Sequence, residues 1–299
     1  MSTLASARRT WSFATRLEAK RVQFAFARVR GTVPVVTYAT WRTGSTSVHH
    51  AIRASRRPAA VKAHSLHWPN ISGEPRSLAG ISWRGATHVG DIAVHRHVVA
   101  RGRRADWVVM VRDPLAIALS LAAFALAAGG HAVPNDEAVD RALVHAPVGA
   151  LDWWLEHDMR PALGWSALDV PFERERGWTE TECRHGRVLV LRADLPDFAK
   201  DEALSRFLGT VVRVVPNNDS RSGGRGKVLD ALVRRLQAHP AIAATAMAQR
   251  SARHFWHEDQ LARLHVRRGA SAHGVASAVP AAQWACQAGS PAFRATLLR

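Results

Sequence analysis

Six consecutive residues after an apolar run, five of them polar and one a glycine, have the types and spacing of an anion-binding loop. The sequence VVTYATWRTGSTSVHHAI, Val35 to Ile52, indicates a strand, a short loop and a helix. Such a turn offers backbone N–H groups and the positive end of a helix dipole to one anion. The glycine would admit close approach, the hydroxyls would donate and the arginine would add charge; the residues are Arg42, Thr43, Gly44, Ser45, Thr46 and Ser47. On its own the pattern fits a purely structural turn equally well, and it lacks the GxxxxGK[ST] sequence of nucleoside triphosphatases.

A second stretch, WVVMVRDPLAIALS, ends a strand in an arginine and then begins a helix. Asp113 occupies the N-cap position and Pro114 the first helical position. Ser120 then lies about two turns, or roughly 10 Å, along the helix. If the strand belongs to a parallel sheet, Arg112 at its carboxyl end faces the ligand crevice. The alternative is that Arg112 pairs with Asp113 or with a helix end.

A third group of residues could move a proton. The sequence VKAHSLHW contains Lys62, His64 and His67, just after a short apolar run. Histidine suits the removal of a proton from a hydroxyl because it ionises near neutral pH. We expect His64 to be this base; the alternatives are His67 and an acid or histidine elsewhere. The two histidines do not indicate zinc, because a third ligand at a suitable spacing is missing, and no metal is expected.

Alternating strands and helices must position these residues. Apolar runs predict strands at Val35–Ala39, Val61–His64, Trp107–Val111 and Val188–Leu191. Helical spacing predicts helices at Thr46–Ser55, Pro114–Ala128, Leu204–Leu208, Lys227–Ala238 and Asp259–Val266. Continuous apolar strands that alternate with helices are typical of an α/β fold in which a parallel sheet is flanked by helices on both faces.

The bulk properties indicate a globular protein with anionic partners. The chain has 299 residues, 47% hydrophobic and 22% charged, with a net charge of +17. This charge suits nucleic acid, acidic glycan, anionic lipid or a phosphorylated small molecule, and does not choose among them. The two cysteines, Cys183 and Cys286, have no metal-like spacing and favour a reducing compartment. We therefore expect a cytoplasmic protein.

The chain divides into three regions. Residues 1–32 form a basic leader without the apolar core of a signal peptide. The leader is either a basic amphipathic helix on an anionic membrane or a poorly ordered or surface-packed segment. Residues 33–270 form a single α/β domain with an insertion on the acceptor side at about 129–185, and residues 271–299 form a loosely structured tail rich in Ala, Ser, Gly and Pro. The apolar run Pro114–Ala128 is short for a membrane span and predicts a buried helix.

Two motifs together resemble the P-loop sulfotransferases, which use 3′-phosphoadenosine 5′-phosphosulfate (PAPS). WRTGSTSV resembles their loop for the 5′-phosphosulfate. VRDPLAIALS matches their Arg-Asp-Pro and the serine eight residues after the arginine, which hold the ribose 3′-phosphate. The resemblance implies the nucleoside triphosphate hydrolase-like fold, PAPS as co-substrate and 3′-phosphate contacts from Arg112 and Ser120. VKAHSLHW resembles the Lys-Thr-His of cytosolic sulfotransferases, which implies that Lys62 and His64 are catalytic.

A narrower resemblance is to bacterial proteins of capsular polysaccharide synthesis. It rests on Gly164, Pro171–Phe172, Gly177–Trp178 and the sequence ARHFWHEDQLARL. Ser166 stands where that family has an aspartate, so a role tied to this aspartate does not transfer. The acceptor implied is a cell-surface glycan or another bacterial hydroxyl compound.

A later basic turn, RSGGRGK, resembles the loop that closes over the 3′-phosphate in cytosolic sulfotransferases. This likeness adds Arg221 to the expected co-substrate site. A solvated basic turn explains the same residues equally well.

The function expected from these motifs is sulfuryl transfer from PAPS to a hydroxyl. Three alternatives stay open: a basic nucleic-acid-binding protein, a P-loop kinase of a small molecule and a non-catalytic member of the fold. Nucleic-acid binding is disfavoured because the chain has no helix-turn-helix, zinc-finger or aromatic RNA motif. The kinase is disfavoured because the loop has no Lys-Ser/Thr pair.

Overall fold

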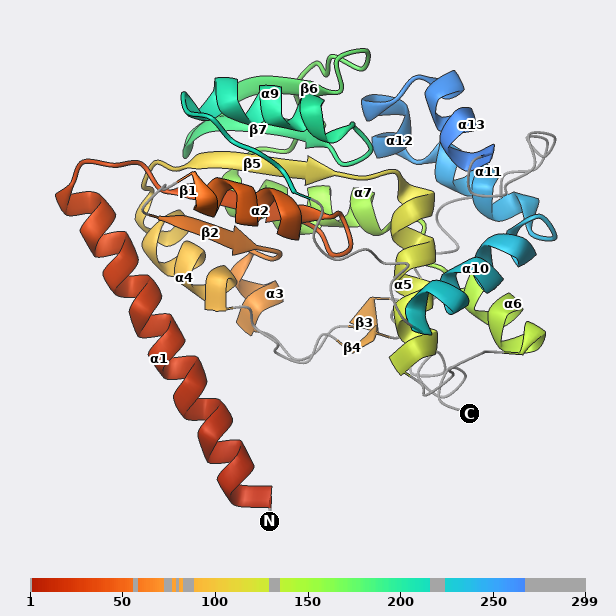
Figure 1. Ribbon diagram of the computed structural model, residues 1–299, viewed down its shortest axis with the longest axis horizontal. Coiled ribbons are helices and arrows are strands. Elements are labelled where there is room, and N and C mark those ends of the chain that lie inside the picture. Colours follow the sequence, from red (N-terminus) through yellow and green to blue (C-terminus); the bar gives the residue numbers. More distant parts are fainter. Residues whose placement is uncertain are drawn as a thin grey trace.

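The fold is built on a five-stranded sheet. The computed structural model describes residues 2–55, 59–72, 77–78, 81–82, 89–128, 135–215 and 224–266. The strands lie in the order β2–β1–β5–β7–β6 (Figure 1). Their bounds are β1 Val35–Ala39, β2 Ala60–Ala63, β5 Asp106–Val111, β6 Trp178–Cys183 and β7 Gly186–Arg192. A separate two-stranded sheet pairs β3 (Ser77–Leu78) with β4 (Ile81–Ser82).

Four strands are parallel and the fifth is antiparallel. β1 pairs with β2 and β5, and β5 pairs with β7, all in parallel. The prediction of a parallel sheet therefore misses β6, which pairs antiparallel with β7 at the edge. The two are joined by a tight turn at Arg184–His185, a connection open only to antiparallel neighbours. Residues Thr179–Glu182 are all polar, and exposed glutamates alternate with more buried threonines, which fits an edge strand with one face in solvent.

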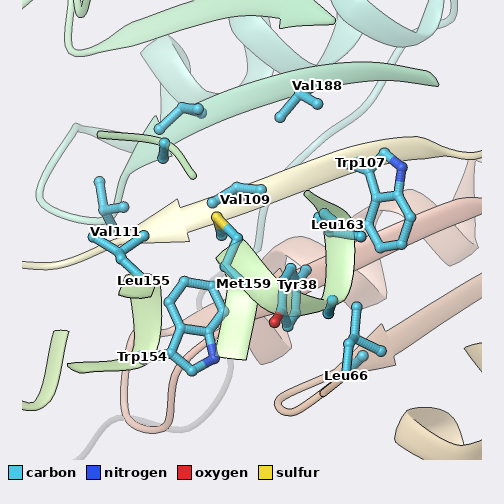
Figure 2. Packing of buried hydrophobic residues seen from close by; sticks show 14 of the residues in the cluster. Tyr38, Leu66, Trp107, Val109, Val111, Trp154, Leu155, Met159, Leu163 and Val188 are labelled. Atoms are coloured by element: carbon cyan, nitrogen blue, oxygen red, sulfur yellow. The ribbon is translucent and has the colours of Figure 1, made fainter. Parts of the chain in front are cut away.

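Helices cover both faces of the sheet. One face packs on α2 (Ser45–Ala54) and α9 (Asp197–Leu208) through the apolar residues of these helices. The other face packs on several short elements: α4 Val89–His97, α7 Ala150–Trp154, η2 Leu155–Met159, α8 Arg160–Leu163 and α12 Arg250–Phe255. Figure 2 shows Trp154 and Met159 of this layer beside Tyr38 and Val109 of the sheet, and the ring of Trp107 lies with its centroid 6.2 Å from that of Tyr38. All five of these side chains are buried.

A further helical layer lies beside the carboxyl end of β5 (Figure 1). α5 (Pro114–Ala128) packs on three helices in an apolar cluster: α6 Asp136–Val144, α10 Gly224–Leu236 and α11 Pro240–Ala248. The prediction of a buried helix at Pro114–Ala128 is confirmed. The predicted cap is present as well, because Leu115 N donates to Asp113 Oδ1 at 3.1 Å. α13 (Glu258–Val266) contributes His265, whose Nε2 lies 3.1 Å from the same oxygen.

The remaining helices lie at the periphery. α1 (Ser2–Val29) is a long helix that runs from the amino end of β1 past α4 and away from the sheet (Figure 1). α3 (Trp68–Ser72) and the short turn η1 (Val99–Arg101) flank α4. In the part of the chain that the structure describes, none of the helices is long and apolar enough to cross a membrane.

The predicted elements agree with the structure except near their ends. Val35–Ala39 matches β1, whereas β2 ends at Ala63 and leaves His64 just beyond the strand. α9 begins at Asp197, earlier than the predicted Leu204, because its first turns are polar and carry little apolar periodicity. The predicted tail at 271–299 lies outside the described residues.

Gly90 sets the fit of α4 against β2. A Cβ atom on Gly90 would lie 2.0 Å from the carbonyl oxygen of Lys62, which is backbone and cannot swing away. We predict that Gly90→Ala lowers the free energy of unfolding by about 1–3 kcal/mol, the range for an overpacked core. Urea unfolding followed by circular dichroism measures this change.

Gly149→Ala is the matched control for Gly90→Ala. A Cβ atom on Gly149 would meet only a side-chain oxygen at 3.5 Å, an ordinary contact. The free energy of unfolding of this variant should stay close to that of the wild type. Equal stabilities of the two variants would show that α4 moves freely relative to β2.

Candidate functional site

The candidate site lies where the order of the strands changes direction. The chain leaves β1 for β2 on one side, while β5 lies on the other side of β1. Ligands of open α/β sheets bind outside the carboxyl ends of the strands at such a switch point. The loop after β1 carries the predicted anion-binding residues, and the end of β5 carries Arg112. The sheet therefore brings the two motifs to one edge. The arrangement is compatible with a P-loop-like fold.

The loop after β1 has an unusual backbone. Arg42 has φ 64°, the one positive value at a non-glycine residue in the described chain, and Gly44 has φ 77°. Left-handed conformations of non-glycine residues cost of order 1–3 kcal/mol and cluster at functional sites. Thr43 Oγ1 donates to the Thr40 carbonyl at 3.0 Å, and Ser47 N donates to the Gly44 carbonyl at 3.3 Å. A Cβ atom on Gly44 would meet nothing within 4 Å, so its backbone faces open space.

Two motifs that are far apart in the sequence contact each other directly. Arg42 Nε donates to Ser120 Oγ at 2.9 Å, which joins the loop to α5. Arg112 Nη1 donates to the carbonyl oxygen of Arg42, which joins the loop to the end of β5. Ser120 is buried, while the two arginines are half-buried. Two guanidinium groups and a hydroxyl thus lie together at the amino end of α2.

Lys62 brings a third positive charge to the loop from β2. Its Nζ donates to Thr46 Oγ1 at 2.7 Å, in the first turn of α2. Burial lowers the pKa of Lys62; Asp91 raises it and the positive charge of Arg42 lowers it further. The amino end of a helix favours a bound anion, and the positive charges of the neighbouring lysine and arginines favour it further. The predicted residues from Arg42 to Ser47 therefore form one cationic cluster with Lys62 and Arg112.

His64 follows β2 and is held by its backbone and its ring. Its N–H donates to Asp91 Oδ1 at 2.7 Å, and its carbonyl accepts from Trp154 Nε1 at 2.7 Å. Its ring Nδ1 lies 2.7 Å from the Ala39 carbonyl oxygen. A carbonyl only accepts, so Nδ1 carries the proton and Nε2 is the basic nitrogen of the neutral imidazole. This tautomer is the one that a general base requires.

Two buried carboxyls that the sequence analysis did not single out hold the segment after β2. Asp158 lies in the π-helical turn η2 and is buried. It accepts hydrogen bonds from four groups: the Tyr38 hydroxyl, Ser65 Oγ, Leu66 N at 2.7 Å and Asn70 Nδ2 at 2.8 Å. Burial raises the pKa of Asp158 and raises that of Asp91 well above its ordinary range. The π-helical turn, a feature frequent at functional sites, is not visible as a sequence pattern.

Other predicted residues lie away from this cationic cluster or outside the described part of the chain. Arg221 lies in the range 216–223, which the structure does not describe. His67 immediately precedes α3, and its carbonyl accepts from Asn70 N at 2.9 Å. Ser166, in the place of the family's aspartate, is buried, and its N–H donates to Asp169 Oδ2 at 2.8 Å. Gly164 ends α8 with φ 62°, a backbone role.

Comparisons with protein-family models, curated proteins and solved structures find no match to this chain. Among the described residues, none of the groups of His, Cys, Asp and Glu could hold a metal ion. The chemistry of the site therefore has to be inferred from its own geometry. Three cations, several hydroxyls and the amino end of a helix suit an anionic phosphate or sulfate ester. His64 adds a group able to take a proton.

Burial raises the pKa of Asp91 and the positive charge of Lys62 lowers it. The dependence of stability on pH shows which effect is larger. Because burial raises the pKa of Asp91 above its ordinary value of 3.8, the folded protein holds this proton where the unfolded chain releases it. The carboxyl therefore lowers stability as pH rises above about 4. We predict that the free energy of unfolding of Asp91→Asn, minus that of the wild type, increases with pH and levels off above the folded-state pKa.

Urea unfolding of both proteins at a series of pH values gives this difference. A difference that falls as pH rises would mean that the backbone hydrogen bonds and the positive charge of Lys62 outweigh burial. The conclusion that burial has the largest effect on the pKa of Asp91 would then be wrong.

Proposed function

We propose that the protein is a sulfotransferase that moves a sulfuryl group from PAPS to a hydroxyl acceptor. The observation that carries the proposal is the contact of Arg42 with Ser120 and Arg112. These residues come from the two sequence motifs that resemble those of P-loop sulfotransferases, and they meet at the switch point of the sheet. The resemblance alone does not require that the motifs touch, so their contact is independent support.

In this proposal, each cation of the cationic cluster has a separate role. The loop N–H groups and Arg42 hold the sulfuryl group and stabilise the charge that develops on the bridging oxygen. Lys62 adds positive charge to the same group from the side of β2. Arg112 and Ser120 hold the ribose 3′-phosphate, a group that ATP lacks. Sulfuryl transfer, like phosphoryl transfer, leaves little covalent chemistry to the protein beyond such positioning.

His64 takes the proton of the acceptor. As the acceptor oxygen bonds to sulfur, the bond from sulfur to the bridging oxygen breaks, the proton goes to His64 Nε2 and adenosine 3′,5′-bisphosphate leaves. The hydrogen bond from Nδ1 to the Ala39 carbonyl keeps Nε2 unprotonated in the neutral ring. Asp91 and Asp158 fix the backbone from His64 to Leu66 and so fix the position of the ring.

The proposed acceptor is a glycan hydroxyl or another bacterial hydroxyl compound, and the proposed setting is polysaccharide biosynthesis in the cytoplasm. This part rests on the narrower resemblance. A small-molecule P-loop kinase is the second candidate, because Lys62 approaches the loop at Thr46 although the loop itself has no lysine. The two candidates differ in the nucleotide that they bind.

The proposal predicts selection for the 3′-phosphate. Adenosine 3′,5′-bisphosphate should raise the melting temperature far more than AMP, which lacks this phosphate, or ATP. Arg112→Ala should weaken bisphosphate binding by about 1.5–3 kcal/mol, the value of a hydrogen bond to a charged group, and barely change AMP binding. Ser120→Ala should have a smaller effect. Calorimetric titration measures each affinity.

Arg263→Ala is the control for Arg112→Ala, since Arg263 is exposed on α13 and pairs with Asp259 at 2.7 Å. Its affinities should equal those of the wild type. Equal binding of AMP and bisphosphate would remove the role of Arg112, and tighter binding of ATP would favour the kinase.

The role of His64 predicts a loss of turnover without a loss of binding. A positioned base contributes about 10²–10⁴-fold, so His64→Ala should lose most of the transfer rate. Bisphosphate affinity should be nearly unchanged, and the acidic limb of the pH–rate profile should disappear. The assay follows transfer of labelled sulfate from PAPS to an acceptor mixture.

His67→Ala provides the comparison, with a milder effect expected because His67 lies three residues further from the end of β2, just before α3. A folded His64→Ala protein with near-normal turnover would exclude His64 as the base. His67 would then be the next candidate.

A further inference from the structure

α1 presents two apolar faces, and only one of them packs on the protein. Phe24 and Ala27 are buried against the body, and the Phe24 ring stacks on His97 of α4 with centroids 5.5 Å apart. Val22, Phe26 and Val29 are 58%, 47% and 85% exposed. At roughly 100° per residue these three share an arc of about 60°, on the side of the helix opposite to Phe24. An apolar stripe therefore runs along the outer face of α1 over its last two turns, from Val22 to Val29.

Exposed arginines border this stripe. Arg21 and Arg28 lie on one side of it by helical spacing, and Arg30 lies over the Phe26 ring at 4.2 Å. Glu18, which pairs with Arg21, is the one acidic residue among the first 31 of the chain. The outer face of α1 thus combines apolar contact area with excess positive charge.

The turn after α4 adds more positive charge beside α1. Arg103 Nη1 lies 3.5 Å from the His97 carbonyl, next to the ring on which Phe24 stacks. Burial lowers the pKa of His97, and Arg101, Arg103, Arg21 and Arg96 lower it further. Burial likewise lowers the pKa of Arg103, and the charges of Arg101 and Arg28 lower it further. The cations of α1 and of the α4–η1 turn therefore act on one another as a single patch.

We propose that α1 docks on an anionic lipid bilayer, with Val22, Phe26 and Val29 in the interface and the flanking arginines on lipid headgroups. A bilayer with acidic lipids offers both an apolar layer and negative charge, the two features that this face presents. A second copy of the chain would bring the same positive patch and a net charge of +17, which repels. A nucleic-acid duplex would leave the apolar stripe without a partner.

This surface is separate from the candidate site. α1 leads into the amino end of β1, whereas Arg42, Lys62 and Arg112 lie at or beyond the carboxyl ends of their strands. The proposal does not depend on the proposed sulfotransferase activity.

Co-sedimentation with lipid vesicles tests the proposal on the full chain. The probes are vesicles of phosphatidylcholine alone and of phosphatidylcholine with about one third phosphatidylglycerol. The protein should bind the second kind and not the first, and high salt should weaken the binding. Phe26→Ser should lower the partition coefficient about tenfold, since a Phe side chain leaves the interface. An Arg21→Gln and Arg28→Gln double variant should lower it by a similar factor.

Phe198→Ser is the matched control, because Phe198 is 74% exposed but lies on α9. It should bind vesicles like the wild type, and the melting temperatures of all variants should confirm that they are folded. Absence of binding to the anionic vesicles, or equal losses in Phe26→Ser and Phe198→Ser, would overturn the proposal. So would a dimer in analytical ultracentrifugation that Phe26→Ser abolishes, or DNA binding that replaces vesicle binding.

Discussion

The structure of the candidate site depends on the Arg42 residue, which three separate elements hold in a left-handed conformation. Its side chain donates to Ser120 of α5, its carbonyl accepts from Arg112 at the end of β5, and its own backbone follows β1. Such a conformation costs free energy that the surrounding contacts must offset. The result is a loop whose glycine backbone faces open space, with like charges beside it. Repulsion among neighbouring cations weakens when an anion binds between them, so the same arrangement that is unfavourable in the free protein favours a bound phosphate or sulfate.

The buried carboxyls Asp91 and Asp158 hold the segment that follows β2, next to this cationic cluster. They accept hydrogen bonds from the backbone of residues 64–66 and from Tyr38, Ser65 and Asn70 side chains. Removal of a carboxylate from water is unfavourable unless such donors replace the solvent. The several donors to Asp158 meet this requirement and fix one position for the segment that carries His64. Rigid placement of His64 and the strained loop are therefore two parts of one packing arrangement between β1, β2 and η2.

The sequence predicted those parts of the fold that local patterns encode. Continuous apolar runs identified β1, β5 and α5, and Ser120 lies about two turns into α5 as predicted, because helix geometry is regular. Asp158 was missed because its partners lie about ninety positions away in the chain, and nothing local marks a carboxyl as an acceptor for distant donors. β6 was missed because this edge strand, with one face in solvent, carries a run of polar residues and not an apolar run. The contact of Arg42 with Ser120 also spans 78 positions, and only the strand order brings it about.

The central claim is that one nucleotide spans the two motifs at the switch point of the sheet. A crystal structure of the protein with adenosine 3′,5′-bisphosphate tests this claim most directly. The account predicts the 5′-phosphate at the loop from Arg42 to Ser47, and the 3′-phosphate within hydrogen-bond distance of Arg112 and Ser120. A nucleotide bound elsewhere, or bound at the loop with its 3′-phosphate in solvent, would contradict it.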